Sequence, residues 1–149
     1  MSYFVDTSIL ARLANMDDPR HQLASDAIYS LHQRGEVLRI TPQNLVELRN
    51  AATRPVAVDG IGLSASEAQV IAMRFEAMFP LLEETPAIFP LWKALVEAEG
   101  IIGKQVHDAR LVAVCHAHRV THLLTFNGPH FVRLSRFGPG VEVVDPSDV

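Results

Sequence analysis

The chain has 149 residues, 48% of them hydrophobic and 20% charged, which is the usual composition of one globular domain with a substantial core. Its formal net charge of −4 argues against a protein that coats nucleic acid nonspecifically, but leaves open an enzyme that acts on nucleic acid. No apolar stretch approaches the ~20 residues of a membrane helix, and residues 1–6 lack the basic start of a signal peptide. We therefore expect a cytoplasmic protein with no membrane segment and a single domain over residues 1–149.

The first half of the chain alternates predicted strands and helices. Residues 2–6 predict a short buried strand, and an apolar helix follows it directly. A second helix is predicted to start at Asp17-Asp18-Pro19, with Pro19 in its first turn, and to end at Gly35. Residues 37–40 predict the next strand, and Thr41-Pro42 restart a helix that runs to about Arg54.

The second half continues the alternation after a loop over residues 55–63. Ser64-Ala65-Ser66-Glu67 resembles a capping box and opens a helix to about Phe79. The apolar side chains of this helix are Val70, Ile71, Phe75, Met78 and Phe79. They are most simply part of the core, although some of them would suit an exposed groove that binds a partner helix. An extended piece is expected at 81–84, helices at 91–99 and from Asp108 onward, strands at 121–125 and 141–144, and a loop at 126–130.

Strands separated by single or paired helices imply parallel pairing. The expected fold class is therefore α/β, with a central parallel β-sheet and helices on both faces in a three-layer α/β/α arrangement. In open parallel sheets, ligands bind beyond the carboxyl ends of the strands.

Three acids stand where such a fold would gather them. Asp6 follows the first strand, and Asp108 lies in register with the apolar positions of its helix, at offsets of three, four and seven residues. Glu47 and Asn44 share one face of the helix that follows the second strand, so they are placed to look into a cleft together. Ionised carboxylates near the interior are rarely left without a partner.

Each acid also has a simpler interpretation. Asp6 would make a good helix N-cap, although Thr7 and Ser8 are also available for that purpose. Asp108 would be favourable near a helix N-terminus, and Glu47 would pair on the surface with arginines nearby in the sequence, Arg49 or Arg54.

Two carboxylates ~4 Å apart repel each other by about 4 kcal/mol at an effective dielectric of 20, so a cluster of acids persists when a cation or shared protons compensate. Ligation by oxygen alone suits Mg²⁺ or Mn²⁺. The other candidate metal site, zinc on Cys115, His118 and His122, requires ligands on two different elements, and Cys115 is more simply a buried small hydrophobe.

Four blocks of sequence, in order and spanning nearly the whole chain, resemble those of PIN domains. The first is Asp6-Thr7-Ser8-Ile9-Leu10, and the second runs from Thr41 to Leu48 with Glu47 as its acid. The third is His107-Asp108-Ala109-Arg110-Leu111, and the fourth runs from His122 to Asn127. The chain is similar above all to the small VapC-like toxins of prokaryotic toxin–antitoxin pairs.

The resemblance implies a hydrolase, an RNA endonuclease that depends on Mg²⁺ or Mn²⁺. Asp6 and Asp108 would bind the metal, and Glu47 would hold a metal-bound water or complete the ligand set. Thr7, Ser8 or Thr125 would orient the first carboxylate. The implied partners are an RNA substrate, a cognate antitoxin protein and a second copy of the chain in a homodimer.

The chain departs from the family in the fourth block, where another acid often stands at the position of Asn127 or three residues later, at His130. Asn127 offers a carbonyl to a metal or water but no charge, so we expect weaker metal binding. The alternative function is a PIN-like binding scaffold without catalysis. A phosphatase of the haloacid-dehalogenase type ranks last, because Ser8 stands where that class requires a second acid.

Overall fold

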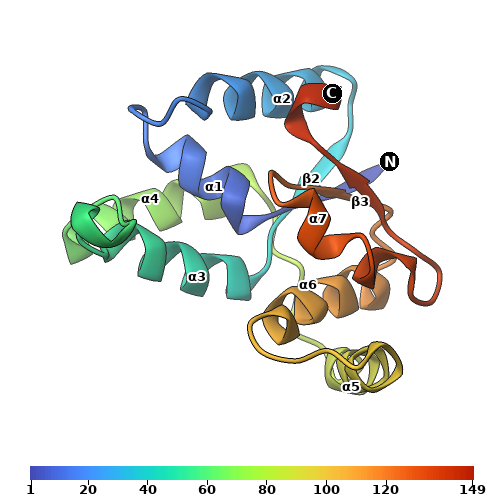
Figure 1. Ribbon diagram of the computed structural model, residues 1–149. Helices are drawn as coiled ribbons and strands as arrows, with labels where there is room; N and C mark the ends of the chain where they lie inside the picture. Colours follow the sequence, from blue (N-terminus) through green and yellow to red (C-terminus); the bar gives the residue numbers. More distant parts are fainter.

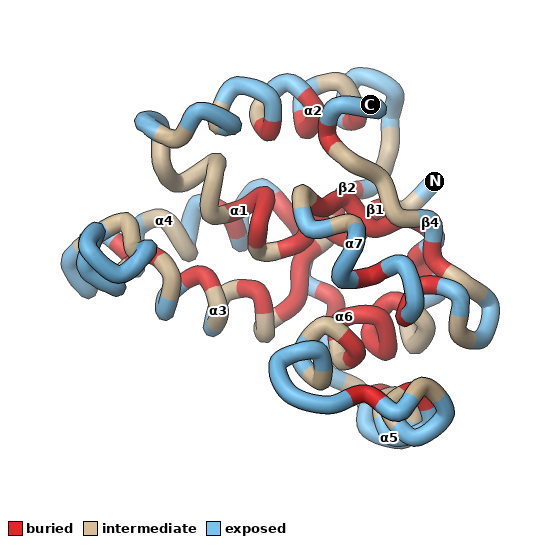
Figure 2. Tube along the Cα trace, in the orientation of Figure 1, coloured by how far each residue is buried: buried red, intermediate tan, exposed pale blue.

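The computed structural model describes residues 1–149 and contains a four-stranded parallel sheet with the strand order β2-β1-β3-β4 (Figure 1). The strands are β1 (Ser2–Val5), β2 (Val37–Arg39), β3 (His122–Leu124) and β4 (Glu142–Val144). In register, Phe4 of β1 is opposite Arg39 of β2 and Leu123 of β3. The two central strands are buried over almost their whole length, as apolar strands of a parallel sheet must be (Figure 2).

Helices cover both faces of the sheet, so the predicted three-layer α/β/α class is confirmed (Figure 1). They are α1 (Thr7–Ala14), α2 (His21–Gln33), α3 (Pro42–Thr53), α4 (Ala65–Met78), α5 (Ile88–Glu99), α6 (Gln105–Ala117) and α7 (Gly128–Phe131). Short 3₁₀ turns lie at Val56–Val58, Leu134–Arg136 and Pro146–Asp148. No helix has the length and apolar character needed to span a membrane.

Alternation along the strands divides the interior into two cores. Phe4 and Leu123 point to one face, where they pack with α5, α6 and α7. Tyr3, Val5 and Leu124 point to the other face, where they pack with α1 to α4. The helices α3 and α6, which carry Glu47 and Asp108, therefore belong to different layers.

Several predicted boundaries were wrong. The second helix begins at His21 and not at Asp17, because Asp18 accepts the backbone N–H groups of Arg20 and His21 and closes a turn first. On this helix Ala24 is buried, whereas the neighbouring Leu23 is exposed. The expected extended piece at 81–84 is reduced to one parallel bridge between Ile40 and Leu81.

The predicted start of the helix at 91–99 was also wrong, because α5 begins at Ile88, where the ring of Pro90 is tolerated in the first turn. The helix expected to open at Asp108 begins three residues earlier at Gln105, which leaves Asp108 in its first turn. The expected loop at 126–130 contains the short helix α7, with Pro129 at its start.

Candidate active site

The three predicted acids come from three elements that meet at the carboxyl edge of the sheet. Asp6 directly follows β1, Glu47 lies on α3 and Asp108 lies on α6. β1 and β3 are parallel neighbours, so their carboxyl ends adjoin and Thr125, directly after β3, lies beside Asp6. The structure thus brings together residues that are about 120 positions apart in the sequence.

Asp6 is 4% exposed, and its carboxylate is held by residues from two elements. Its Oδ2 atom accepts hydrogen bonds from Ser8 Oγ and Thr125 Oγ1, both at 2.7 Å, and from the Ser8 backbone N–H at 3.4 Å. Asp6 is therefore the N-cap of α1, as its simpler interpretation required. All of these bonds end on Oδ2, so Oδ1 is the oxygen free to accept a ligand.

Glu47 is joined to α1 through a buried polar cluster. Thr7 Oγ1 donates to Glu47 Oε2 at 2.7 Å, and Asn44 Nδ2 donates to Thr7 Oγ1 at 3.0 Å. Asn44 is fully buried and completes the capping box of α3 with Thr41. The predicted common face of Asn44 and Glu47 is thus observed as a shared contact on Thr7.

The simpler interpretation of Glu47 was wrong. The two nearby arginines that were candidates to pair with it contact other groups, since Arg49 donates to Gln69 and Arg54 to the carbonyl of Asp59. Glu47 is half-buried, and its charge contributes to raising the pKa of Asp108.

Asp108 shows the electrostatic cost of this convergence. Its side chain is 27% exposed, and the pKa of its carboxyl is raised from 3.8 to about 6, chiefly by burial and then by repulsion from Asp6 and, to a smaller extent, Glu47. His130 lowers this pKa, because its Nδ1 atom lies 4.0 Å from Asp108 Oδ2, and His107 lowers it to a smaller extent. Asp108 is therefore neither fully solvated nor fully compensated by a positively charged partner.

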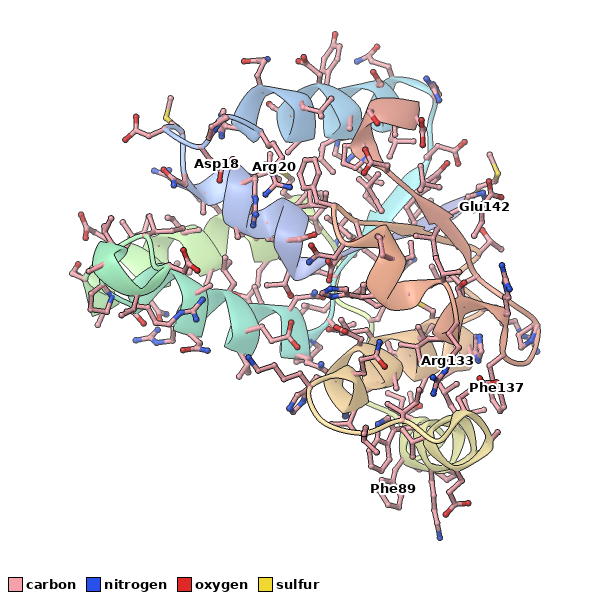
Figure 3. All side chains as sticks on the ribbon, in the orientation of Figure 1. Asp18, Arg20, Phe89, Arg133, Phe137 and Glu142 are labelled. Atoms are coloured by element: carbon pink, nitrogen blue, oxygen red, sulfur yellow. The ribbon has the colours of Figure 1, made fainter.

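Asn127, the predicted site residue of the fourth block, directly follows Phe126 after β3. It is exposed, and its contact with the site is made by its backbone N–H, which donates to Thr125 Oγ1 at 2.9 Å. The preceding Phe126 donates its backbone N–H to Ser8 Oγ, and its ring lies 4.9 Å below the guanidinium of Arg20, which is labelled beside α1 in Figure 3. This segment supports the groups that hold Asp6.

Two polar residues at the site were missed in the sequence. Gln43 Nε2 donates to Glu47 Oε1 at 2.7 Å and to the His107 carbonyl at 3.1 Å, and Arg110 donates to Gln43 Oε1 at 3.2 Å. The spacing of four residues between Gln43 and Glu47 on one helix was a usable signal. Arg110 had no such signal, because its ionic partner is the distant Glu84.

The donor set fits a hard divalent cation in type. Asp6 and Asp108 both offer carboxylate oxygens. Asp6 Oδ1 accepts no hydrogen bond, and the negative charge of Asp108 is opposed by burial and by the neighbouring acids. In the geometry of the structure no three His, Cys, Asp or Glu side chains gather closely enough to enclose an ion. The residues present therefore match Mg²⁺ or Mn²⁺ in the chemistry of their donor atoms.

The residues of the alternative zinc site are engaged elsewhere. Cys115 is fully buried, and burial raises the pKa of its thiol far above the usual value. His118 Nε2 contacts the Glu83 carbonyl at 2.7 Å, and His122 stacks on Tyr3 at the opposite end of β3 from the acids.

The apolar helix α4 divides its side chains between core and surface. Phe75 and Phe79 are buried, whereas Val70, Met73 and Met78 are about half exposed. A largely apolar groove of about 440 Å³ runs between α4 and α2, and its lining includes Leu13, Met16, Ile28, Tyr29, Ile71 and Met78.

Comparison with known proteins identifies the family of the chain. The sequence model of the PIN domain matches residues 3–136, and the chain therefore belongs to the PIN domain family. No curated protein sequence matches the chain significantly.

Solved structures share the fold over nearly the full chain. VapBC2 from Rickettsia felis, bound to a DNA fragment from its promoter, has a TM-score of 0.69 at 18% identity and covers 97% of this chain and 98% of its own. VapBC-1 from nontypeable Haemophilus influenzae has a TM-score of 0.68 at 16% identity, covering 99% of both chains. The Mycobacterium tuberculosis toxin VapC20, described as cleaving the Sarcin-Ricin loop, has a TM-score of 0.63 at 23% identity, covering 86% of this chain and 92% of its own. The expected VapC-like resemblance is confirmed, and at these identities it shows the fold.

Proposed function

We propose that the protein is a metal-dependent endoribonuclease and the toxin of a toxin–antitoxin pair. The observation that carries the proposal is the convergence of Asp6, Glu47 and Asp108 at the carboxyl edge of the sheet, with the pKa of Asp108 raised to about 6. Membership of the PIN family and the fold shared with VapC20 support hydrolysis of RNA as the reaction.

In this proposal Asp6 and Asp108 hold Mg²⁺ or Mn²⁺. A bound ion of this kind would lower the pKa of water and stabilise the leaving oxygen of a phosphodiester. The protein contributes orientation: Ser8 and Thr125 hold one oxygen of Asp6, so that the other faces the ligand.

Glu47 has a different role in this proposal. Thr7 donates to one of its carboxylate oxygens and Gln43 to the other, which fixes the direction of the Glu47 side chain. It is thus placed to accept a proton from the attacking water. Asn127 contributes its backbone N–H to the support of Thr125, and its side-chain carbonyl is available to a bound water.

The proposed protein partner is an antitoxin that presents an apolar helical segment to the groove between α2 and α4. The solved complexes VapBC2 and VapBC-1 have this fold, which supports a partner of that kind. The half-exposed Met73 and Met78 on α4 are adaptable apolar contacts. We also propose that the chain forms a homodimer. We propose that it acts in the cytoplasm, which contains its RNA substrate and keeps a free thiol such as that of Cys115 reduced.

The test is cleavage of RNA by the purified chain with Mg²⁺, Mn²⁺ or EDTA, beside Asp6→Asn and Asp108→Asn. Cleavage that needs metal and disappears in both variants, with the fold retained, would support the proposal. Equal cleavage in all three proteins would overturn it. A chain that neither binds metal nor cleaves RNA would favour the binding scaffold, for which the exposed, uncharged side chain of Asn127 is the supporting observation.

A further inference from the structure

Gln43 occupies an unusual position, because its side chain bridges the two layers that carry the acids. It lies on α3, whose buried residue Leu48 belongs to the core on one face of the sheet, and it bonds to α6, which lies in the core on the other face. Its amide makes three contacts, to Glu47 Oε1, to the His107 carbonyl and to Arg110. One side chain thus connects the helix of Glu47 with the helix of Asp108.

The hydrogen bonds of the Gln43 amide fix its orientation. The nitrogen faces two acceptors, a carboxylate oxygen of Glu47 and the carbonyl of His107, while the oxygen faces a guanidinium N–H of Arg110. If the amide were turned end for end, each of these contacts would join two donors or two acceptors. Only the observed orientation of the Gln43 amide therefore satisfies all three hydrogen bonds.

Arg110 is itself held in place. Its guanidinium makes a two-pronged contact with Glu84, at 2.6 Å and 3.3 Å, and directs its remaining bond to Gln43 at 3.2 Å. The result is a continuous chain of contacts from Glu84 through Arg110 and Gln43 to Glu47. Arg110 lies two residues after Asp108 on α6.

We infer that Gln43 and Arg110 are positioning residues that set the direction of Glu47 and its spacing from Asp108 for metal-dependent cleavage. This inference rests on the proposed function. Residues that orient carboxylates from behind typically contribute roughly 10- to 100-fold in metal affinity or activity. Neither residue needs to touch the substrate for this role.

The test combines two measurements on the full chain: Mn²⁺ affinity by calorimetry, and the rate of cleavage of a mixed-sequence single-stranded RNA oligonucleotide. Gln43→Leu and Arg110→Leu are expected to lower kcat by roughly 10- to 100-fold, with KM changed by less than about threefold. Because both residues act through one chain of contacts, the double variant should lose little more than Gln43→Leu alone. Thermal unfolding verifies that each variant is folded.

Two further variants separate positioning from packing. Gln43→Glu keeps the shape of the side chain but places a carboxylate against Glu47, so its loss should be at least as large as that of Gln43→Leu. Gln22→Leu is the matched control, because Gln22 makes the same kind of contact four residues along its helix, to Asp26, on the exposed surface of α2. It should behave as wild type.

The outcomes distinguish this inference from the proposed function. If wild type binds Mn²⁺ and cleaves RNA, and both Gln43 variants match it in kcat and affinity, the inference is overturned and the proposed function stands. Additive losses in the double variant would also overturn it, because they would show that the two residues act separately. If wild type neither binds Mn²⁺ nor cleaves the oligonucleotide, the proposed function fails and takes the inference with it.

Discussion

Asp108→Asn is expected to make the metal-free protein more stable at alkaline pH while removing its proposed activity. The pKa of this carboxyl rises from 3.8 to about 6 in the folded chain, roughly two units, and at about 1.36 kcal/mol per unit this corresponds to about 3 kcal/mol. The largest cause is burial, followed by repulsion from Asp6, and the asparagine amide carries no charge to be affected by either.

The sign follows from the direction of the shift. Because the folded chain binds the proton more tightly than the unfolded chain, the stabilising contribution is present in full below about pH 4 and is lost as pH rises through about 6. Above that window the ionised carboxylate lowers the free energy of unfolding of wild type by up to about 3 kcal/mol. The variant should therefore gain stability at about pH 8 and gain little at about pH 4.

The assay is urea unfolding in EDTA at these two pH values, with Asp17→Asn as the control, since Asp17 is an exposed acid in the turn before α2. The control should match wild type at both. A variant of Asp108 that is no more stable than wild type at the higher pH would refute the reasoning. So would an equal gain at both values, because a gain that does not depend on pH cannot come from removing this charge.

Three other predictions concern buried polar groups, two at the site and one in the core. Thr125→Val removes a donor to Asp6 and should weaken Mn²⁺ binding by roughly 10- to 100-fold in calorimetry, whereas Thr125→Ser should retain most of it; equal weakening in both would contradict the role of the hydroxyl. Thr7→Val leaves the buried Asn44 amide without its acceptor and should lower the free energy of unfolding by about 1–3 kcal/mol in urea, so an unchanged midpoint would argue against the cluster. The Cys115 thiol, buried and with a raised pKa, should resist alkylation in the native chain and react on unfolding, and rapid native labelling would contradict its placement.

The layers and the acids could be predicted from the sequence because both depend on local patterns. Apolar strands alternating with helices determine parallel pairing, and parallel pairing brings the carboxyl ends of β1 and β3 to one edge. Asp6 follows one of these strands directly, so its place at that edge followed from the topology.

The remaining features depend on contacts that no local pattern contains. The starts of α2 and α6 were set by turns, as at Asp18, whose carboxylate competes with helix formation. Arg110 could not be assigned to the site, because its partners Gln43 and Glu84 are 67 and 26 residues away. The backbone N–H of Asn127 donates to Thr125 Oγ1 at the start of α7, a contact that no side-chain pattern predicts.

The most direct test of the central claim compares two quantities in the same buffer. One is the dissociation constant for Mn²⁺ from calorimetry, and the other is the Mn²⁺ concentration that gives half-maximal cleavage of RNA. We expect the two concentrations to agree for wild type, and we expect Asp6→Asn to abolish both binding and cleavage while the chain remains folded. Cleavage that persists in Asp6→Asn, or that proceeds in EDTA, would contradict the claim that the carboxylates at the edge of the sheet hold the metal for this reaction.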